Sequence, residues 1–386
     1  AVVSSEMEDI IDELAGDGKT YEKGSSEQKI KDMYECVTDM ENRNETGLGP
    51  LKPHMDSIRS ASSIDEYVDA LAHLSGEFGF SSIVGGYNIM QDKADSSRYA
   101  VYMMYADTLI GKEYVEGENT QEYMDLYLDY ISNMLMEFGM TADEAAQSTD
   151  SIEGLLRDIC ASTLTTEQLY DPAMTYNVYT AQGLQELFSN VDVPKMLRTL
   201  RIEGQDKYIV MDVEQAKKIN SLLQEENLQA LKDYSTFVML NDTAKYANAN
   251  YARLSDDMKN ALYGITESWG DEKTWKNLTQ DMLPWDFGMI YVKEHFSAED
   301  KAAVEEMIGQ ILEEYEVIIN RQDWMSDATK KKAIRKLETM QVKIGYPDRW
   351  PAARDMMQVT PVSEGGSLLS NLLVSMQVAI ADSLNK

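Results

Sequence analysis

The sequence predicts a mainly α protein, a multi-helix lobe with a minor β-hairpin. Apolar residues recur at helical spacing along most of the 386 residues. The breaks between these stretches carry helix-capping residues more often than hairpin turns. One β-branched run departs from the helical period, so strand content should be small.

Capping residues mark where several helices begin. Ser63 followed by Glu66 predicts a capping box, in which the hydroxyl and the carboxylate satisfy helix N–H groups that have no partner within the helix. Thr165 with Gln168 repeats the pattern. Pro172 then disfavours helical geometry at the preceding residue, so that element should end there.

A helical hairpin is predicted after residue 120. Residues 121–138 carry one apolar stripe, and Gly139 can supply the left-handed stop that ends a helix. Thr141 with Glu144 caps the next helix.

A long helix is predicted to begin at Ser297, which forms a capping box with Asp300. Its apolar stripe comprises Val304, Met307, Ile311, Tyr315 and Ile318. The β-branched run is Lys207–Val213, which we expect to form one strand of a small hairpin.

The charge excludes several classes of partner. Lys and Arg total 35 against 67 Asp and Glu, so the net charge is −32. Such a surface repels nucleic acid and anionic lipid, and we expect neither nucleic-acid binding nor membrane contact by this segment. An acidic wall that attracts basic peptides is the alternative to a simple solvated surface.

No long linker or internal repeat divides the chain. We therefore expect residues 1–350 to form one helical lobe, with residues 351–386 as its tail. No apolar run approaches the roughly 20 residues that span a bilayer. Cys36 and Cys160 are the two cysteines, and the sequence leaves open whether they form one bridge or remain buried thiols.

No catalytic or metal-binding motif is present. The three histidines, His54, His73 and His295, lack the spacing that presents two imidazoles to one metal, and His-Glu-x-x-His is absent. Phosphate-binding glycine loops and the Gly-x-Ser-x-Gly elbow are also absent. We therefore predict no catalytic residue, no metal ligand and no cofactor in this chain, and the sequence identifies no substrate-binding residue.

One stretch nevertheless resembles a known family. Trp324-Met325, Thr329-Lys330, Ala333, Lys336-Leu337 and Gly345-Tyr346-Pro347-Asp348 follow one another in an order and spacing similar to those of the neprilysin and endothelin-converting-enzyme family of zinc metallopeptidases. Upstream, Tyr291 with Phe296 and Tyr176 with Asn177 resemble further family segments. The similarity covers about residues 25–350.

The resemblance implies a fold and a partner. Family members fold as two mainly helical lobes around an enclosed chamber, with zinc in the lobe built largely from the C-terminal half. The family's Asn-Ala-Tyr segment and zinc ligands have no counterpart here, and neither has its opening Asp-Phe-Tyr segment. The resemblance thus implies the large helical lobe alone, either as an excised domain or as a product that lost its catalytic half, partnered by a catalytic lobe and an oligopeptide substrate.

In this interpretation the lobe encloses peptides and contributes no chemistry of its own. Zinc is expected only in the catalytic lobe, and an extracytoplasmic location follows from where family members are found. Two other hypotheses remain. One is a free-standing acidic binding protein for a basic peptide or protein partner, and the other is an enzyme with an unrelated site, which no spacing of residues supports.

Overall fold

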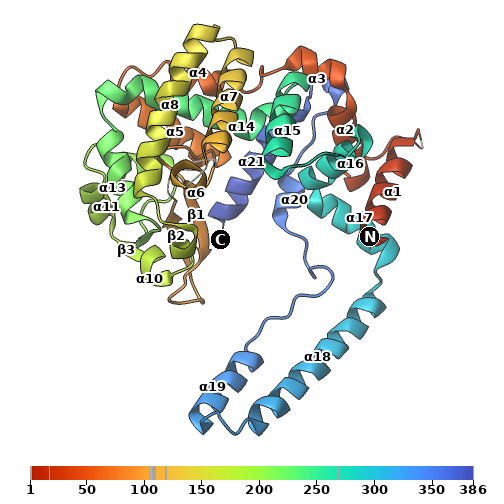
Figure 1. Cartoon of the computed structure of the whole chain (residues 1–386). Coiled ribbons are helices and arrows are strands. Elements are labelled where there is room, and N and C mark those ends of the chain that lie inside the picture. The colour runs from red at the N-terminus through yellow and green to blue at the C-terminus, as the bar shows by residue number, and fades with distance from the viewer. Residues whose placement is uncertain are drawn as a thin grey trace. The chain divides into compact units, whose positions relative to one another are not determined.

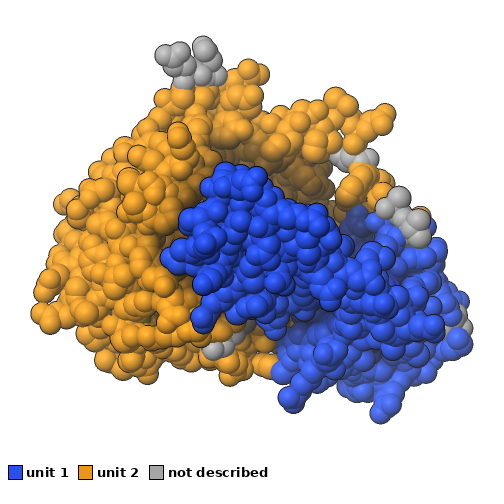
Figure 2. All heavy atoms as spheres, turned by 90° about the horizontal axis from the view of Figure 1, so that it is seen from below, with its two compact units in different colours: residues 1–34, 275–355 blue, residues 35–274, 356–386 orange. Residues whose placement is uncertain are grey.

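The chain folds into two compact units, each built from two separate stretches of sequence (Figure 2). Unit 1 comprises residues 1–34 and 275–355, and unit 2 comprises residues 35–274 and 356–386. The computed structural model describes residues 2–16, 18–104, 106, 110–117, 120–267 and 269–385. The unit boundaries fall within helices, which explains why no Gly-rich or Pro-rich linker marks them in the sequence.

Helices are the regular secondary structure of unit 1 among its described residues. Its elements are α1 (Val2–Gly16), the first part of α2 (Ser26–Thr38), most of α16 (Asp271–Met282), α17 (Pro284–His295), α18 (Ala298–Arg321), α19 (Asp327–Glu338) and most of α20 (Ala352–Met356). Helix α1 packs against α17. Lys276 on α16 lies 2.6 Å from Asp12 on α1, so an ion pair joins these two helices as well.

A buried ion cluster ties the separate stretches of unit 1 together. Asp286 on α17 is 1 % exposed and accepts a hydrogen bond of 2.7 Å from the Ser26 hydroxyl on α2. Lys29 Nζ lies 3.5 Å from the same carboxylate and donates to the backbone carbonyl of Arg354. Arg354 Nε lies 3.6 Å from Asp286. One buried carboxylate therefore holds residues from both ends of the chain, and losing it would remove the buried counter-charge of Lys29, whereas Arg354 also pairs with Asp355.

Unit 2 contains the sheet and the larger core. Its helices are α3 (Met40–Thr46), α4 (Lys52–Arg59), α5 (Ile64–Phe78), α6 (Lys112–Glu116), α7 (Gln121–Glu137), α8 (Ala142–Ser162), α9 (Thr166–Leu169), α10 (Pro172–Thr175), α11 (Ala181–Leu187), α12 (Val193–Thr199), α13 (Val213–Leu222), α14 (Leu228–Thr243), α15 (Ala249–Tyr263) and α21 (Leu368–Leu384). Short 3-10 turns cover Glu225–Asn227, Ala244–Tyr246 and Val362–Glu364.

Four short strands form one mixed sheet in the order β1-β2-β4-β3. They are β1 (Tyr87–Gln91), β2 (Tyr99–Met103), β3 (Asn177–Tyr179) and β4 (Tyr208–Val210). β1 and β2 form an antiparallel hairpin, β2 runs parallel to β4, and β3 pairs antiparallel with β4. All three residues of β4 are buried, because the strand lies in the interior of the sheet.

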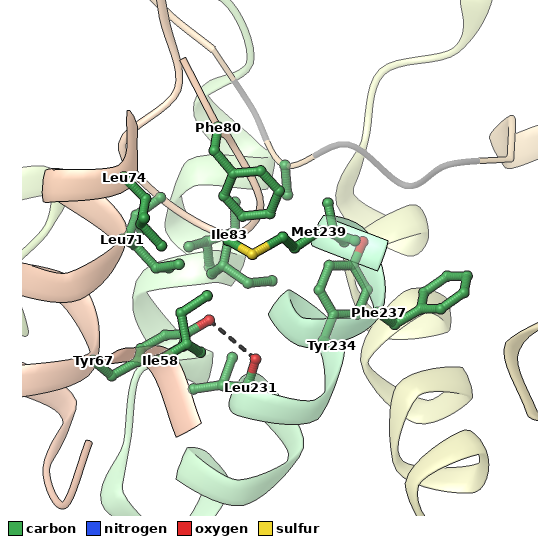
Figure 3. Packing of buried hydrophobic residues seen from close by; sticks show 14 of the residues in the cluster. Ile58, Tyr67, Leu71, Leu74, Phe80, Ile83, Leu231, Tyr234, Phe237 and Met239 are labelled. Carbon is green, nitrogen blue, oxygen red and sulfur yellow. Dashed lines mark hydrogen bonds between the residues drawn. The ribbon is translucent and has the colours of Figure 1, made fainter. Parts of the chain in front are cut away.

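Helix α14 lies at the centre of the unit 2 core. It packs against α4, α5, α7 and α8, and Phe237 near its middle is fully buried between the rings of Tyr127 and Tyr130 on α7. On another side, the Tyr67 hydroxyl of α5 donates to the carbonyl of Leu231 at 3.1 Å (Figure 3). A helix buried on most of its faces shows no single apolar stripe in its sequence.

The predicted fold class is confirmed (Figure 1). The reciprocal capping boxes at Thr141 and Thr165 form as predicted. Ser63 does cap α5, but Glu66 accepts from the backbone and hydroxyl of Ser62 instead of closing the box on Ser63. That expectation was wrong in detail, because a hydroxyl one residue earlier offers the carboxylate two donors.

The strand and the cysteines also have clear outcomes. Within Lys207–Val213 only Tyr208–Val210 is a strand. It pairs with β2 on one side and β3 on the other, whereas a hairpin would have given it a single neighbouring strand. Its partners come from distant segments, which the local pattern could not reveal. Cys36 and Cys160 are separate buried thiols with no bridge between them.

Replacing Phe237 by Ala should destabilise the protein by about 3–5 kcal/mol, because it empties a fully buried aromatic site. Tyr170→Ala is the matched control, since that ring is 85 % exposed and its loss should change stability by less than about 0.5 kcal/mol. Urea unfolding followed by circular dichroism measures both. Equal midpoints for the two variants would contradict the placement of α14 in the core.

Candidate functional site: the α18–α19 arm

Helices α18 and α19 form an antiparallel pair, called the arm below (residues 298–338, Figure 1). The reciprocal capping box of Ser297 and Asp300 starts α18 as predicted, and Ser326 caps α19. Neither helix contains a buried residue. Long helices in proteins normally gain their stability by burying an apolar face. The apolar face of α18 is not buried in this way, although its sequence pattern predicts that it would be.

The uncovered face carries the predicted apolar stripe. Four of its residues are exposed, namely Met307 (58 %), Ile311 (44 %), Tyr315 (53 %) and Ile318 (43 %). Val304 and a second apolar row, Ile308, Leu312 and Ile319, are half-buried. Helix α18 is therefore apolar on more of its surface than one neighbouring helix can cover. A contiguous exposed apolar patch of this kind is typical of an interaction surface.

The two helices of the arm carry opposite charge. Helix α18 has Glu299, Asp300, Glu305, Glu306, Glu313, Glu314 and Glu316 against Lys301 and Arg321, whereas α19 has Lys330, Lys331, Lys332, Arg335 and Lys336 against Asp327 and Glu338. This difference favours their antiparallel pairing. Lys330 adds a direct link, since its Nζ donates to the carbonyl of Asn320 at 2.8 Å.

The Gly345-Tyr346-Pro347-Asp348 turn lies against the start of the arm. Gly345 has φ +62°, and a Cβ at this position would overlap the Phe296 ring just before α18. The rings of Phe296 and Tyr346 meet edge to face, with centroids 6.1 Å apart. Both the positive φ and the close approach require glycine here.

Lys301 closes this contact, which we call the clasp (Phe296, Lys301, Gly345, Tyr346, Asp348). Its Nζ donates to the Tyr346 carbonyl at 3.0 Å, lies 4.6 Å from the centre of the Tyr346 ring, and bonds Asp348 Oδ1 at 2.6 Å. The hydrogen bond from Lys301 holds the pKa of Asp348 below its usual value, and the same bond raises the pKa of Lys301. Because Asp348 is 96 % exposed, the ion pair itself contributes little, and the carbonyl and ring contacts carry the clasp.

The other signature residues in and near the arm make local contacts or lie on its surface. Trp324 is 80 % exposed at the turn between the helices and donates to the side chain of Gln322. The Thr329 amide donates to the Ser326 hydroxyl that caps α19. Ala333 and Pro347 are half-buried, whereas Lys336 is exposed. Just before the arm, the Tyr291 hydroxyl of α17 donates to Glu6 on α1 at 3.0 Å.

Tyr176 and Asn177 lie apart from these residues, in the sheet of unit 2. The Tyr176 hydroxyl donates to Asp92 at 2.5 Å, and Lys207 forms an ion pair with the same carboxylate. The hydrogen bonds from Lys207 and Tyr176 hold the pKa of Asp92 well below its usual range. Asn177 donates to the carbonyl of Val210 on β4. These two signature residues therefore fix the sheet.

The sequence did not predict two residues that contact the Gly345-Tyr346-Pro347-Asp348 turn, namely Lys301 and Trp350. Lys301 reaches a carbonyl 45 residues later in the chain, a separation that no local pattern encodes. Trp350 stacks on Tyr346 with ring planes 8° apart. The aromatic spacing of Tyr346 and Trp350 was the only available signal.

The three histidines are not arranged as the ligands of a zinc site. His54 packs edge to face on Phe78, His73 is exposed on α5, and His295 stacks on Tyr291 in the other unit. Within the described residues, no group of three or more His, Cys, Asp or Glu side chains is arranged to hold a metal ion. In the same part of the chain, no helix is long and apolar enough to span a membrane.

Solved structures identify the class of fold. The chain aligns over its whole length with the zinc metalloprotease ZMP1 of Mycobacterium tuberculosis in its open state, at a TM-score of 0.85 and 21 % identity, covering 59 % of that chain. PEPO from Lactobacillus rhamnosis HN001 gives a TM-score of 0.83 at 20 % identity, with 61 % of that chain covered. The fold is thus one found in metallopeptidases.

The sequence identifies the family within this class. A profile described as Peptidase family M13 matches residues 2–347, so the chain belongs to peptidase family M13. It is 23 % identical to a neutral endopeptidase of Lactobacillus helveticus and 22 % identical to mouse neprilysin, over 92 % and 90 % of this chain. The chain spans about half the length of these relatives, 55 % and 50 %. The predicted neprilysin-like resemblance is confirmed.

Gly345→Ala should destabilise the clasp, because a left-handed φ costs about 1–2 kcal/mol with a Cβ present and the Phe296 ring must also move. Gly309→Ala is the matched control within the arm. It has open space at its Cβ and lies mid-helix, so it should stabilise α18 by roughly 0.5–1 kcal/mol. Hydrogen exchange across residues 298–350 reads out both, and slower exchange in the Gly345 variant would refute the clasp.

Asp92→Asn should lower the melting temperature at neutral pH. The pKa of Asp92 is depressed in the folded state, so its stabilising effect is complete above the unfolded value of about 4 and is lost as pH falls towards the folded value. The difference between wild type and variant should therefore shrink below about pH 4. Melting curves from pH 7 to pH 2.5 test this, and a gap that widens in acid would contradict it.

Proposed function

We propose that this chain is the non-catalytic lobe of an M13 zinc metallopeptidase and that it pairs with a zinc-bearing catalytic region, on the same or a companion polypeptide. The uncovered stripe of the arm is the observation that carries the proposal. Its four exposed apolar residues need a partner surface, and the longer relatives contain additional chain that this protein does not match. The clasp would hold the arm in position for that partner.

The role of the lobe in this proposal is containment. A helical lobe over a zinc cleft keeps out large folded proteins and bulk water, while short flexible peptides can enter. Substrates would thus be limited to oligopeptides. Residues 1–350 would supply this enclosing lobe, with residues 351–386 as its tail. The lobe itself would bind no zinc and cleave no peptide.

Two further expectations concern the location of the protein and the partners that its charge disfavours. We expect it outside the cytoplasm, and this expectation comes from its resemblance to the neprilysin-like peptidases. The acidic surface suits neither nucleic acid nor anionic membrane as a partner.

Pairing can be tested with a separately produced catalytic region of an M13 peptidase. Ile311→Glu places a charge in the stripe and should weaken co-purification with that region at least tenfold. Tyr263→Glu is the matched control, because that exposed ring lies outside the arm and its charge should not matter. Equal co-purification of both variants would overturn the arm as the pairing surface.

The size of the native product decides whether such a region exists. An intact mass far above 43.7 kDa would mean that the polypeptide continues into a catalytic lobe. A mass of 43.7 kDa, with no companion polypeptide recovered, would overturn the proposal and favour the free-standing binding protein.

A further inference from the structure

A second surface, which lies in unit 2, carries charge of both signs around one cavity. The cavity has a volume of about 450 Å³ and lies among the end of α4, the turn between α7 and α8, the first turns of α8 and the start of α14. Its walls include Arg59, Phe138, Met140, Glu144, Ser148 and Asp233. This volume falls in the range that holds small organic ligands.

The negative side of the cavity is Asp233. This residue is 5 % exposed, and its carboxylate accepts hydrogen bonds from the Ser148 hydroxyl and the Gln229 amide, both at 2.9 Å. Both donors are neutral. Within the described part of the chain, no cation lies at ion-pair distance from Asp233. A buried carboxylate without a counter-charge is costly, so this site favours a positively charged group.

The positive side is Arg59. Its guanidinium lies over the Phe138 ring, 5.2 Å from the centroid, and its Nη1 is enclosed by protein without a hydrogen-bond acceptor, so a ligand in the cavity would meet this group through its other nitrogens. Among the residues that the structure describes, no carboxylate pairs with it, although the charge of Arg59 helps to lower the pKa of Glu144 after the larger effects of the Thr141 hydrogen bonds. A guanidinium with free donors recognises carboxylates, since its planar donors match the two carboxylate oxygens.

We propose that this cavity binds a small zwitterion, an α-amino acid or a short peptide, with its carboxylate at Arg59 and its ammonium at Asp233. Each ligand charge would meet the unpaired protein charge of opposite sign. Phe138 and Met140 form an apolar part of the wall, which favours a ligand with an apolar side chain. A singly charged ligand would leave one protein charge unpaired. The inference is independent of the proposed pairing role.

Calorimetric titration of the full chain tests the proposal with three probes. L-Leucine represents free amino acids, glycyl-L-leucine represents peptides, and N-acetyl-L-leucinamide lacks both charges. Binding of either of the first two, but not of the third, is expected. The tighter of the first two identifies the natural source of the ligand. Failure of both zwitterions to bind at about 10 mM, or equal binding of the uncharged probe, would overturn the proposal.

Two variants connect binding to the named charges. Arg59→Met keeps the length of the side chain, removes its charge, and should weaken zwitterion binding at least tenfold. Arg253→Met is the control, because that arginine pairs with Asp257 on the exposed face of α15. Asp233→Asn should weaken binding as much as Arg59→Met does. A circular dichroism spectrum of the Asp233 variant is the check that this variant folds. Wild-type affinity in the Arg59 variant alone suffices to reject the site.

Discussion

The buried carboxylate of Asp286 is the contact on which unit 1 depends. It bonds Ser26 near the start of the chain and lies beside Lys29 and Arg354, so it joins stretches more than 250 residues apart. The arm lies within the segment between Asp286 and Arg354. Closing a long loop costs only slightly more entropy than closing a short one, so one buried cluster is enough to define the base of the arm.

The two units use their sequences differently. In unit 2, helices bury whole faces, and α14 is covered on most sides. In unit 1, α18 buries none of its residues, and several of its apolar side chains are exposed. The periodic pattern of α18 predicts a buried stripe, and the structure leaves that stripe exposed. This mismatch between local pattern and burial marks α18 as the part of unit 1 whose sequence is not explained by its own packing.

Local signals were sufficient for much of the fold and little of the site. Thr141, Thr165 and Ser297 start helices where the sequence predicts, since capping involves residues three positions apart. The sheet was mostly missed, because β4 is completed by strands from distant segments. Lys301 was missed for the same reason. Its partner residues belonged to the recognised signature, but spacing alone does not report contact.

Met307 gives the arm a chemical property that packing alone does not describe. Met307 is the most exposed residue of the stripe, with 58 % of its surface accessible to solvent. Oxidation to the sulfoxide would place a polar, branched group in the middle of an apolar face. A partner seated on the stripe would shield this side chain, so Met307 in the covered arm would be oxidised more slowly than in the exposed arm.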